Sequence, residues 1–279
     1  MERSLRDSTD HGSADHQYVP GAARHGAAPV IRLRAVREAC VAHPVAVQCS
    51  ICRLRAECLP AELEGDALDD LDGRLASGRR KVAQGEALFH AGDRFDAVFA
   101  VWTGSFKTVV TTRHGREQVT GFRMAGDLVG LEGIHASRQA ADAIALEDSQ
   151  VCVIPFAGLQ MLVRDAPALQ ERLQSQMSRE IANAHSAMLY LGSMSAEERV
   201  AAFLLDLAAR FETRGYSGSS LLLRMTRAEL GSYLGLKSET VSRTLTRLQA
   251  DGLLSVCSRR ITITDPKGLQ QLLEGGCVT

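Results

Sequence analysis

The chain has 279 residues, a net charge of −1 and 45% hydrophobic residues, so its length and apolar content suit about two globular domains. No apolar run approaches the ~18 residues of a membrane span, and the charged start carries no secretory signal, which predicts a cytoplasmic protein without membrane contact. Seven cysteines in a reducing compartment argue against a disulfide framework and favour metal ligands, redox groups or small core residues.

Residues 1–38 lack a periodic apolar pattern, and we expect a disordered N-terminal extension there. Residues 39–62 form a cysteine-rich segment, in which "VQCSICRLRAECLP" holds a C-x2-C-x5-C array of Cys49, Cys52 and Cys58. Three thiolates this close repel one another unless a cation or a cluster holds them. The array therefore predicts a metal or iron–sulfur site.

Residues 63–162 change to a β pattern. After a short acidic helix with leucines on one face, residues 80–156 alternate in short apolar runs that glycines interrupt about every ten residues. This spacing predicts an antiparallel sandwich or barrel. The stretch "TTRHGREQVTGF" predicts a hairpin with its turn at His114 and Gly115. We expect His90, His114 and His135 to be turn or surface residues rather than ligands.

Residues 163–194 predict one long helix, because apolar residues recur three or four positions apart after Pro167. So narrow a stripe packs either on its own domain or against a second copy of the chain, and the many polar residues between favour a homodimer. The stripe that we assign to the dimer consists of Leu173, Met177, Ile181, Ala184, Met188 and Leu191.

Residues 195–279 predict a DNA-binding unit. Ser195 with Glu198, and Thr226 with Glu229, are capping boxes that start two helices. Gly235 ends the second of these helices, and another helix over about 238–250 presents an apolar face. The stretch "LLSVCSRRITIT" then alternates as a hairpin, so the unit is a helix-turn-helix with a wing. Residues 224–260 hold seven lysines and arginines against three acidic residues, which suits DNA.

The second helix of such a unit enters the major groove with its first turns toward the base edges. There Arg243 can donate two bonds to guanine, Glu239 can accept from a cytosine amino group, and Ser242 can reach a base. Alternatively, Glu239 and Arg243 are only a surface ion pair. Candidates for contact with the DNA backbone are Lys237, Thr240, Arg247, Arg259 and Arg260.

The order of these parts resembles the FNR (fumarate and nitrate reduction) branch of the catabolite activator protein (CRP/FNR) superfamily, over about residues 45–265. The motifs that carry the resemblance are "CSICRLRAECLP", "GDLVG", "VCVIPF", "SAEERVAAFLLDLAARF" and "LGLKSETVSRTLTRLQ". The resemblance implies an α+β fold: an N-terminal antiparallel β-roll (jelly roll) like that of cyclic-nucleotide-binding domains, a long dimerisation helix and a C-terminal winged helix-turn-helix. It implies a transcription activator for anaerobic regulation that contacts RNA polymerase. Glu239, Ser242 and Arg243 would read a TTGAT-type inverted repeat in double-stranded DNA.

The same resemblance suggests a fourth ligand for the three clustered cysteines. Iron–sulfur clusters take four cysteines, and Cys152 on the last predicted strand is the remote candidate. The family holds an oxygen-labile 4Fe–4S cluster that converts to a 2Fe–2S form, and its four ligands match Cys49, Cys52, Cys58 and Cys152. Zinc competes, although paired CxxC motifs would then be expected. No role is assigned to Cys40, Cys257 and Cys277.

The sequence departs from the related proteins in two respects, one at the nucleotide site and one in the dimerisation helix. Superfamily members that bind cyclic AMP follow a Gly-Glu with an arginine and a hydroxyl residue at the phosphate, whereas this chain has Gly126-Asp127 and Arg138-Gln139. We therefore expect no cyclic nucleotide. FNR proteins often place an acidic residue three positions after Ile181, where this chain has Ala184. Without repulsion at that position, we expect a leakier oxygen switch.

Two alternative functions remain. A regulator of the same fold could sense nitric oxide or another redox signal through haem or the cluster. An iron–sulfur electron-transfer protein is the alternative from a different class, and the helix-turn-helix argues against it. The sequence has no nucleophile–base constellation, phosphate loop or paired catalytic carboxylates, so we do not expect an enzyme.

Overall fold

The computed structural model describes residues 48–61, 63–65, 68–69, 71–72 and 78–274. The expected disordered extension over 1–38, together with Cys40 and Cys277, lies outside these ranges. The chain divides into two units, Met1–Val41 and Ala42–Thr279, and every element below belongs to the second.

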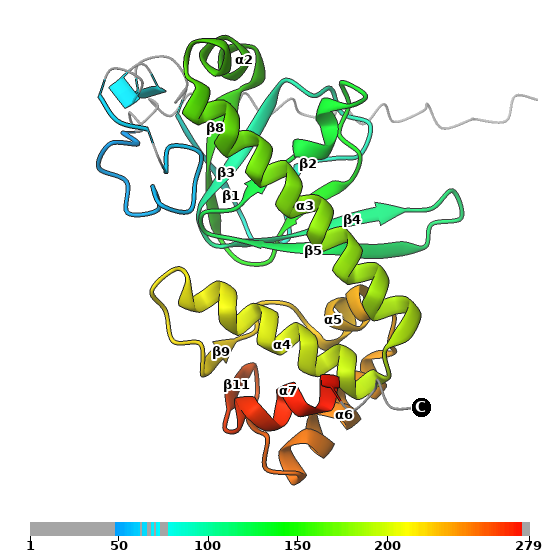
Figure 1. The fold of residues 1–279 in the computed structure, drawn as a ribbon. Coiled ribbons are helices and arrows are strands. Elements are labelled where there is room, and N and C mark those ends of the chain that lie inside the picture. The colour runs from blue at the N-terminus through cyan, green and yellow to red at the C-terminus, as the bar shows by residue number, and fades with distance from the viewer. Residues whose placement is uncertain (1–47, 62, 66–67, 70, 73–77, 275–279) are drawn as a thin grey trace, which may run out of the picture. The chain divides into compact units, whose positions relative to one another are not determined.

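Two four-stranded antiparallel sheets form the β-roll, which confirms the predicted fold (Figure 1). The first sheet has the strand order β1 (Arg79–Val82), β8 (Ser149–Pro155), β3 (Ala97–Thr103) and β6 (Leu128–Val129). The second has the order β2 (Ala87–Phe89), β7 (Asp142–Ala145), β4 (Ser105–Thr111) and β5 (Glu117–Met124). A short 3-10 helix, Leu131–Ile134, follows β6. Inward-facing apolar side chains of both sheets, including Phe99, Phe106 and Val151, form a shared core.

Strands β4 and β5 form the predicted hairpin, and its turn lies where expected. The Thr112 amide donates to the Arg116 carbonyl at 2.8 Å, and Gly115 has a positive φ of 75°. Glycine adopts this conformation without steric cost, which explains why it stands in the turn.

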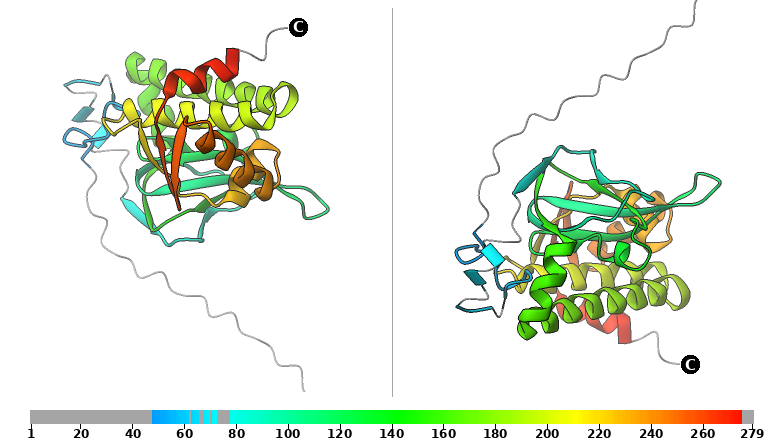
Figure 2. Two further views of the ribbon diagram at one scale, coloured as in Figure 1. Left: turned by 90° about the horizontal axis from the view of Figure 1, so that it is seen from below. Right: turned by 90° about the horizontal axis from the view of Figure 1, so that it is seen from above.

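Two helices follow the roll: α2 (Phe156–Asp165) and the longer α3 (Pro167–Ser193). Proline at the first turn of α3 lacks the amide needed to continue α2, so the chain breaks at Ala166. α3 runs alongside the roll in every view (Figures 1 and 2). Its apolar stripe has two environments. Leu173 packs against the core of its own roll, whereas the later residues Met177, Ile181, Met188 and Leu191 are exposed in the single chain.

The C-terminal region is a winged helix-turn-helix. Its helices are α4 (Ala196–Glu212), α5 (Arg227–Leu234), α6 (Ser238–Ala250) and α7 (Pro266–Glu274), and its strands are β9 (Ser220–Leu222), β10 (Leu254–Cys257) and β11 (Arg260–Ile263). Both predicted capping boxes are present, and Gly235 ends α5 with a φ of 65°. The predicted wing is the β10–β11 hairpin, and β9 joins it as a third strand.

Polar contacts connect the roll with the first helix of the helix-turn-helix. The Lys107 ammonium on β4 lies 2.8 Å from the Glu229 carboxylate on α5, and both side chains are largely buried. The Val119 amide on β5 donates to the Ser232 hydroxyl at 2.9 Å. Among the described residues, none of the helices is long and apolar enough to cross a membrane.

Candidate metal centre and nucleic-acid interface

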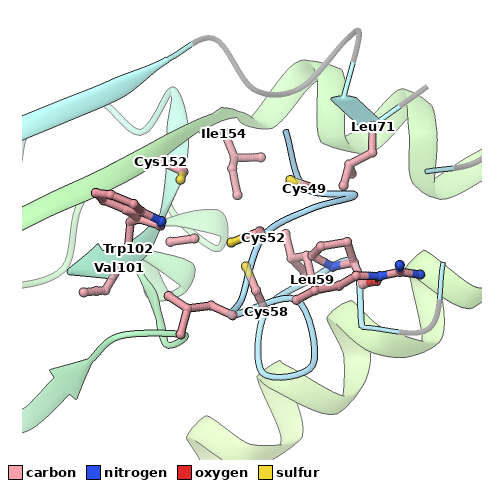
Figure 3. A pocket seen from close by; sticks show the side chains of 13 residues that line it. Cys49, Cys52, Cys58, Leu59, Leu71, Val101, Trp102, Cys152 and Ile154 are labelled. Atoms are coloured by element: carbon pink, nitrogen blue, oxygen red, sulfur yellow. The ribbon is translucent and has the colours of Figure 1, made fainter. Parts of the chain in front are cut away.

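Four cysteines from two distant parts of the chain line one pocket (Figure 3). Cys49, Cys52 and Cys58 come from the loop before the roll, and Cys152 comes from β8. Most of the remaining lining is apolar: Leu54, Leu59, Pro60, Leu71, Ala100, Val101, Trp102 and Ile154, with Arg55 as the one charged side chain. The structure thus brings together all four cysteines that the sequence predicts as ligands.

Tight turns and two leucines shape the cysteine loop, which we define as residues 48–60. The Cys52 amide donates to the Cys49 carbonyl at 3.2 Å, and the Cys58 amide donates to the Leu54 carbonyl at 3.0 Å. Leu54 and Leu59 are buried, so the loop is anchored by apolar contacts as well. At its start, the Asp72 carboxylate accepts from the Cys49 amide at 2.5 Å.

The cysteine loop is also bound to α3. Arg172 donates to the carbonyls of Cys58 and Ala56 at 3.1 and 3.0 Å, and the buried amide of Gln176 donates to the Glu57 carbonyl at 3.2 Å. Sequence reasoning did not identify Arg172 or Gln176. The only available signal was two polar residues beside the apolar stripe of a helix, which is common on any amphipathic helix.

The pocket disfavours free thiolates. Burial raises the pKa of the Cys58 thiol to about 12 and moves the pKa of Cys49 upward as well, with repulsion from Cys58 and Asp72 adding to the shift. Burial also raises the pKa of Cys152, although hydrogen bonding and positive charge from Arg79 oppose it. At neutral pH these three thiols are protonated unless a metal replaces their protons.

The four thiols are donors of the kind that iron–sulfur clusters and zinc both take. Within the ranges that the structure describes, no three His, Cys, Asp or Glu side chains lie close enough to hold one metal ion. Tetrahedral zinc requires four ligands around one centre. A 4Fe–4S cluster would take four cysteine ligands, and Cys49, Cys52, Cys58 and Cys152 are the residues that would hold it. His90, His114 and His135 are exposed, as expected for turn and surface residues.

The predicted recognition helix is α6. Its buried face is Val241, Leu245 and Leu248, as predicted from the sequence. The three proposed base-reading residues, Glu239, Ser242 and Arg243, are all exposed on the opposite face.

Side chains of the recognition helix make contacts within the chain. Arg243 and Glu239 form the ion pair that the sequence left as an alternative, at 2.6 Å. Arg247 pairs with Glu197 of α4 at 2.6 Å. Of the other candidates for DNA-backbone contact, Lys237, Arg259 and Arg260 are exposed and Thr240 is half-buried.

Three residues that the sequence comparison aligned with a cyclic-nucleotide site, Asp127, Arg138 and Gln139, make contacts within the chain. The exposed Arg138 donates to the Gly92 carbonyl at 2.8 Å. Gln139 is 4% exposed, and its amide lies against Gly130 and Gly133. The Asp127 carboxylate accepts from Arg210 and Arg214 at 2.6 and 2.5 Å.

Comparison with known proteins identifies the family. The Crp-like helix-turn-helix domain matches residues 198–272, and the cyclic nucleotide-binding domain matches residues 79–166. The fumarate and nitrate reduction regulatory protein of Escherichia coli (strain K12) is 40% identical over 227 residues, which cover 81% of this chain and 90% of that protein. The transcriptional activator protein anr of Pseudomonas aeruginosa is 42% identical over 248 residues, covering 89% and 98%.

A solved structure agrees with this assignment. FixK2 from Bradyrhizobium japonicum matches with a TM-score of 0.64 at 28% identity, covering 70% of this chain and 96% of FixK2. The curated relatives are regulators of transcription rather than enzymes. The chain therefore belongs to the FNR family of DNA-binding transcription regulators.

Proposed function

We propose that this regulator senses oxygen through a 4Fe–4S cluster bound by Cys49, Cys52, Cys58 and Cys152. The observation that carries the proposal is the convergence of four thiols, three from a loop and one from a strand, on one apolar pocket. When bound, the cluster supplies an iron centre that reacts with oxygen and is degraded to a 2Fe–2S form. The family membership supports the same assignment.

The contacts of the cysteine loop provide a route from this site to the dimer. Four bound thiolates fix the loop to β8, and Arg172 and Gln176 join the same loop to α3. Loss of the cluster frees the loop and alters the packing of α3. The exposed residues Met177 and Ile181 of α3 form a homodimer seam in this proposal, and the dimer brings two α6 helices to half-sites one helical turn apart.

We propose that Glu239, Ser242 and Arg243 read a TTGAT-type half-site in each arm of an inverted repeat. Their exposure at the start of α6 supports this assignment. The exposed Lys237, Arg259 and Arg260 contact phosphates, together with Thr240 and Arg247. RNA polymerase is the expected protein partner. Asp127 and Arg138 are engaged in contacts within the chain, and Gln139 stands where the related proteins follow the arginine with a hydroxyl residue, so we expect no cyclic nucleotide ligand.

Anaerobic purification of two cysteine variants tests the proposal. The wild type should contain four irons per monomer, show a brown visible band that bleaches in oxygen, and bind the inverted repeat only before bleaching. Cys152→Ser should lose iron and DNA binding, whereas Cys257→Ser, which changes an exposed cysteine of the wing, should keep both. Four irons and unchanged DNA binding in Cys152→Ser would falsify the ligand set. A Soret band would indicate haem, and a colourless protein would indicate zinc or no metal.

A further inference from the structure

An arginine that the cluster proposal does not use lies beside Cys152. Arg79 on β1 pairs directly with Cys152 on β8 in the antiparallel register, so both side chains project from the same face of the sheet. The Arg79 guanidinium carbon lies 3.6 Å from the centroid of the Trp102 ring. Trp102 itself lines the cysteine pocket next to Cys152 (Figure 3).

An irregularity of the sheet explains why Trp102 reaches this position. The register between β3 and β8 shifts between Val101 and Thr103, which places Trp102 at a bulge. A bulge turns a side chain away from the regular alternation of the strand. The indole ring of Trp102 thereby lies at the wall of the pocket, and the Arg79 guanidinium stacks on it through a cation–π interaction.

The charge and hydrogen-bonding groups of Arg79 act on Cys152. The strand register places the positive charge of Arg79 next to Cys152 on one face of the sheet, and such a charge stabilises a metal-bound thiolate. The Nε of Arg79 is buried and has no hydrogen-bond partner in the described part of the chain. A buried donor without a partner is costly, and a nearby thiolate or bound sulfide would satisfy it.

We propose that Arg79, held on Trp102, is a positioning residue that donates to the sulfur of Cys152 and retains metal at this ligand. The inference rests on the proposed cluster and adds to it the residue that stabilises the one ligand outside the cysteine loop. Four thiolates give a 4Fe–4S site a net negative charge, and the half-buried cation of Arg79 next to one of them offsets that charge. Groups that donate to metal ligands typically contribute ~10–100-fold to metal affinity.

The neighbouring Arg80 provides a matched control. It carries the same charge on the same strand, but it pairs with Val151, is exposed and projects from the opposite face. Arg79→Gln and Arg80→Gln therefore change the net charge equally, and only the first removes a cation from Cys152. Arg79→Lys keeps the charge and loses the planar donor, so it should lie between wild type and Arg79→Gln.

The first experiment loads the full-length variants with iron and sulfide without oxygen and follows the release of iron to a chelator. Arg79→Gln should release iron about tenfold faster than wild type, and Arg80→Gln should match wild type. Equal rates for Arg79→Gln and Arg80→Gln would overturn the inference. Because Trp102 is the only tryptophan of the chain, its fluorescence reports on the fold and the stacking in every variant.

A second experiment separates this inference from the proposed cluster. Cd²⁺ binds cysteine thiolates whether or not iron does, and its thiolate absorption gives the affinity of metal-free, reduced protein. Arg79→Gln should bind Cd²⁺ about tenfold more weakly than Arg80→Gln. If wild type takes up no iron but this difference is found, the cluster is wrong and the role of Arg79 stands. If Cd²⁺ binds both variants equally, the role of Arg79 is wrong.

Discussion

Two of the three side chains that we expect to read DNA are paired with each other. In the free chain, Arg243 and Glu239 lie 2.6 Å apart on an exposed face of α6. An exposed pair of this spacing stabilises a helix by only about 0.3–0.5 kcal/mol. A base contact that replaces it contributes more, about 1–3 kcal/mol of discrimination. The energy of the pair is therefore too small to prevent the proposed base contacts.

Arg243→Ala and Arg259→Ala should affect DNA binding differently. Arg243→Ala should weaken binding to the TTGAT-type repeat by about 1–3 kcal/mol and relax the preference at one base pair. Arg259→Ala in the wing should weaken all sequences alike and reduce the salt dependence by about one counterion. Fluorescence anisotropy with the repeat and a scrambled duplex measures both effects. Equal losses on the two duplexes for Arg243→Ala would show that this residue contacts only phosphate.

The raised thiol pKa values make metal loading depend on pH. The pKa of Cys58 is about 12, and those of Cys49 and Cys152 are also raised by burial, so all three thiols carry protons at neutral pH. Metal binding must release these protons, and affinity therefore rises as the pH increases toward the thiol pKa. Cd²⁺ titrations between about pH 6.5 and about pH 8.5 should show this increase. Cys58→Ser should flatten it and Cys257→Ser should not; an affinity independent of pH would contradict the prediction.

Single residues show where prediction from the sequence stops. Cys49, Cys52 and Cys58 are close along the chain, so their spacing alone indicates metal chemistry. Arg79 is different, because its role depends on the strand register that places it opposite Cys152. No local pattern in the sequence contains that register.

Among the structural elements, the cysteine loop and α3 share the contacts on which the proposed mechanism depends. Arg172 joins them through two carbonyls of the loop, those of Ala56 and Cys58. A charged donor to a carbonyl contributes about 1.5–3 kcal/mol when buried and less at a half-exposed site such as this. In the proposed mechanism, these bonds transmit movement of the loop to the helix.

Arg172→Met should uncouple the cluster from dimerisation. Methionine keeps the length and helix propensity of arginine but donates no hydrogen bond. The variant should still load four irons, while its dimer dissociation constant should change less between the cluster-bound and cluster-free forms than that of wild type. Arg179→Met, at an exposed position of the same helix, is the control and should behave as wild type. Sedimentation velocity under nitrogen measures the difference, and identical coupling in both variants would exclude the role of Arg172.

Helix boundaries in the C-terminal region were predictable, because capping residues mark them locally. Thr226, Glu229 and Gly235 fix both ends of α5, and the structure agrees at each. The strand β9 has three residues and exists only because it pairs with β11, so it left no signal of its own. The helix α7 has nine residues and one fully buried side chain, Leu269, which is too little periodicity to identify from sequence.

At the scale of the whole molecule, α3 exposes a row of apolar side chains in the single chain. Met177, Ile181 and Met188 are 39%, 58% and 68% exposed, and Ala184 lies exposed among them. Burying such side chains contributes about 25 cal/mol per Å² of apolar surface, which favours a paired helix. An acidic residue at Ala184 would bring two like charges together across that pair.

Ala184→Asp should therefore weaken the cluster-free dimer. The repulsion between the two carboxylates should raise its dissociation constant and make DNA binding depend more strictly on the cluster. Sedimentation of metal-free wild type and variant tests this, with Ala184→Ser as the uncharged control. Equal dissociation constants for wild type and Ala184→Asp would mean that position 184 does not face its symmetry mate.

One carboxylate connects the roll to the start of α5. Glu229 closes the capping box with Thr226 and also accepts from Lys107 of β4. If the roll moves away from the helix-turn-helix, the ion pair between Lys107 and Glu229 breaks. The first turn of α5 then keeps its capping box but loses this contact with β4. Amide hydrogen exchange at the first turn of α5 should then accelerate while α6 stays protected. Deuterium uptake at this end of α5 therefore measures how strongly the β-roll is bound to the helix-turn-helix.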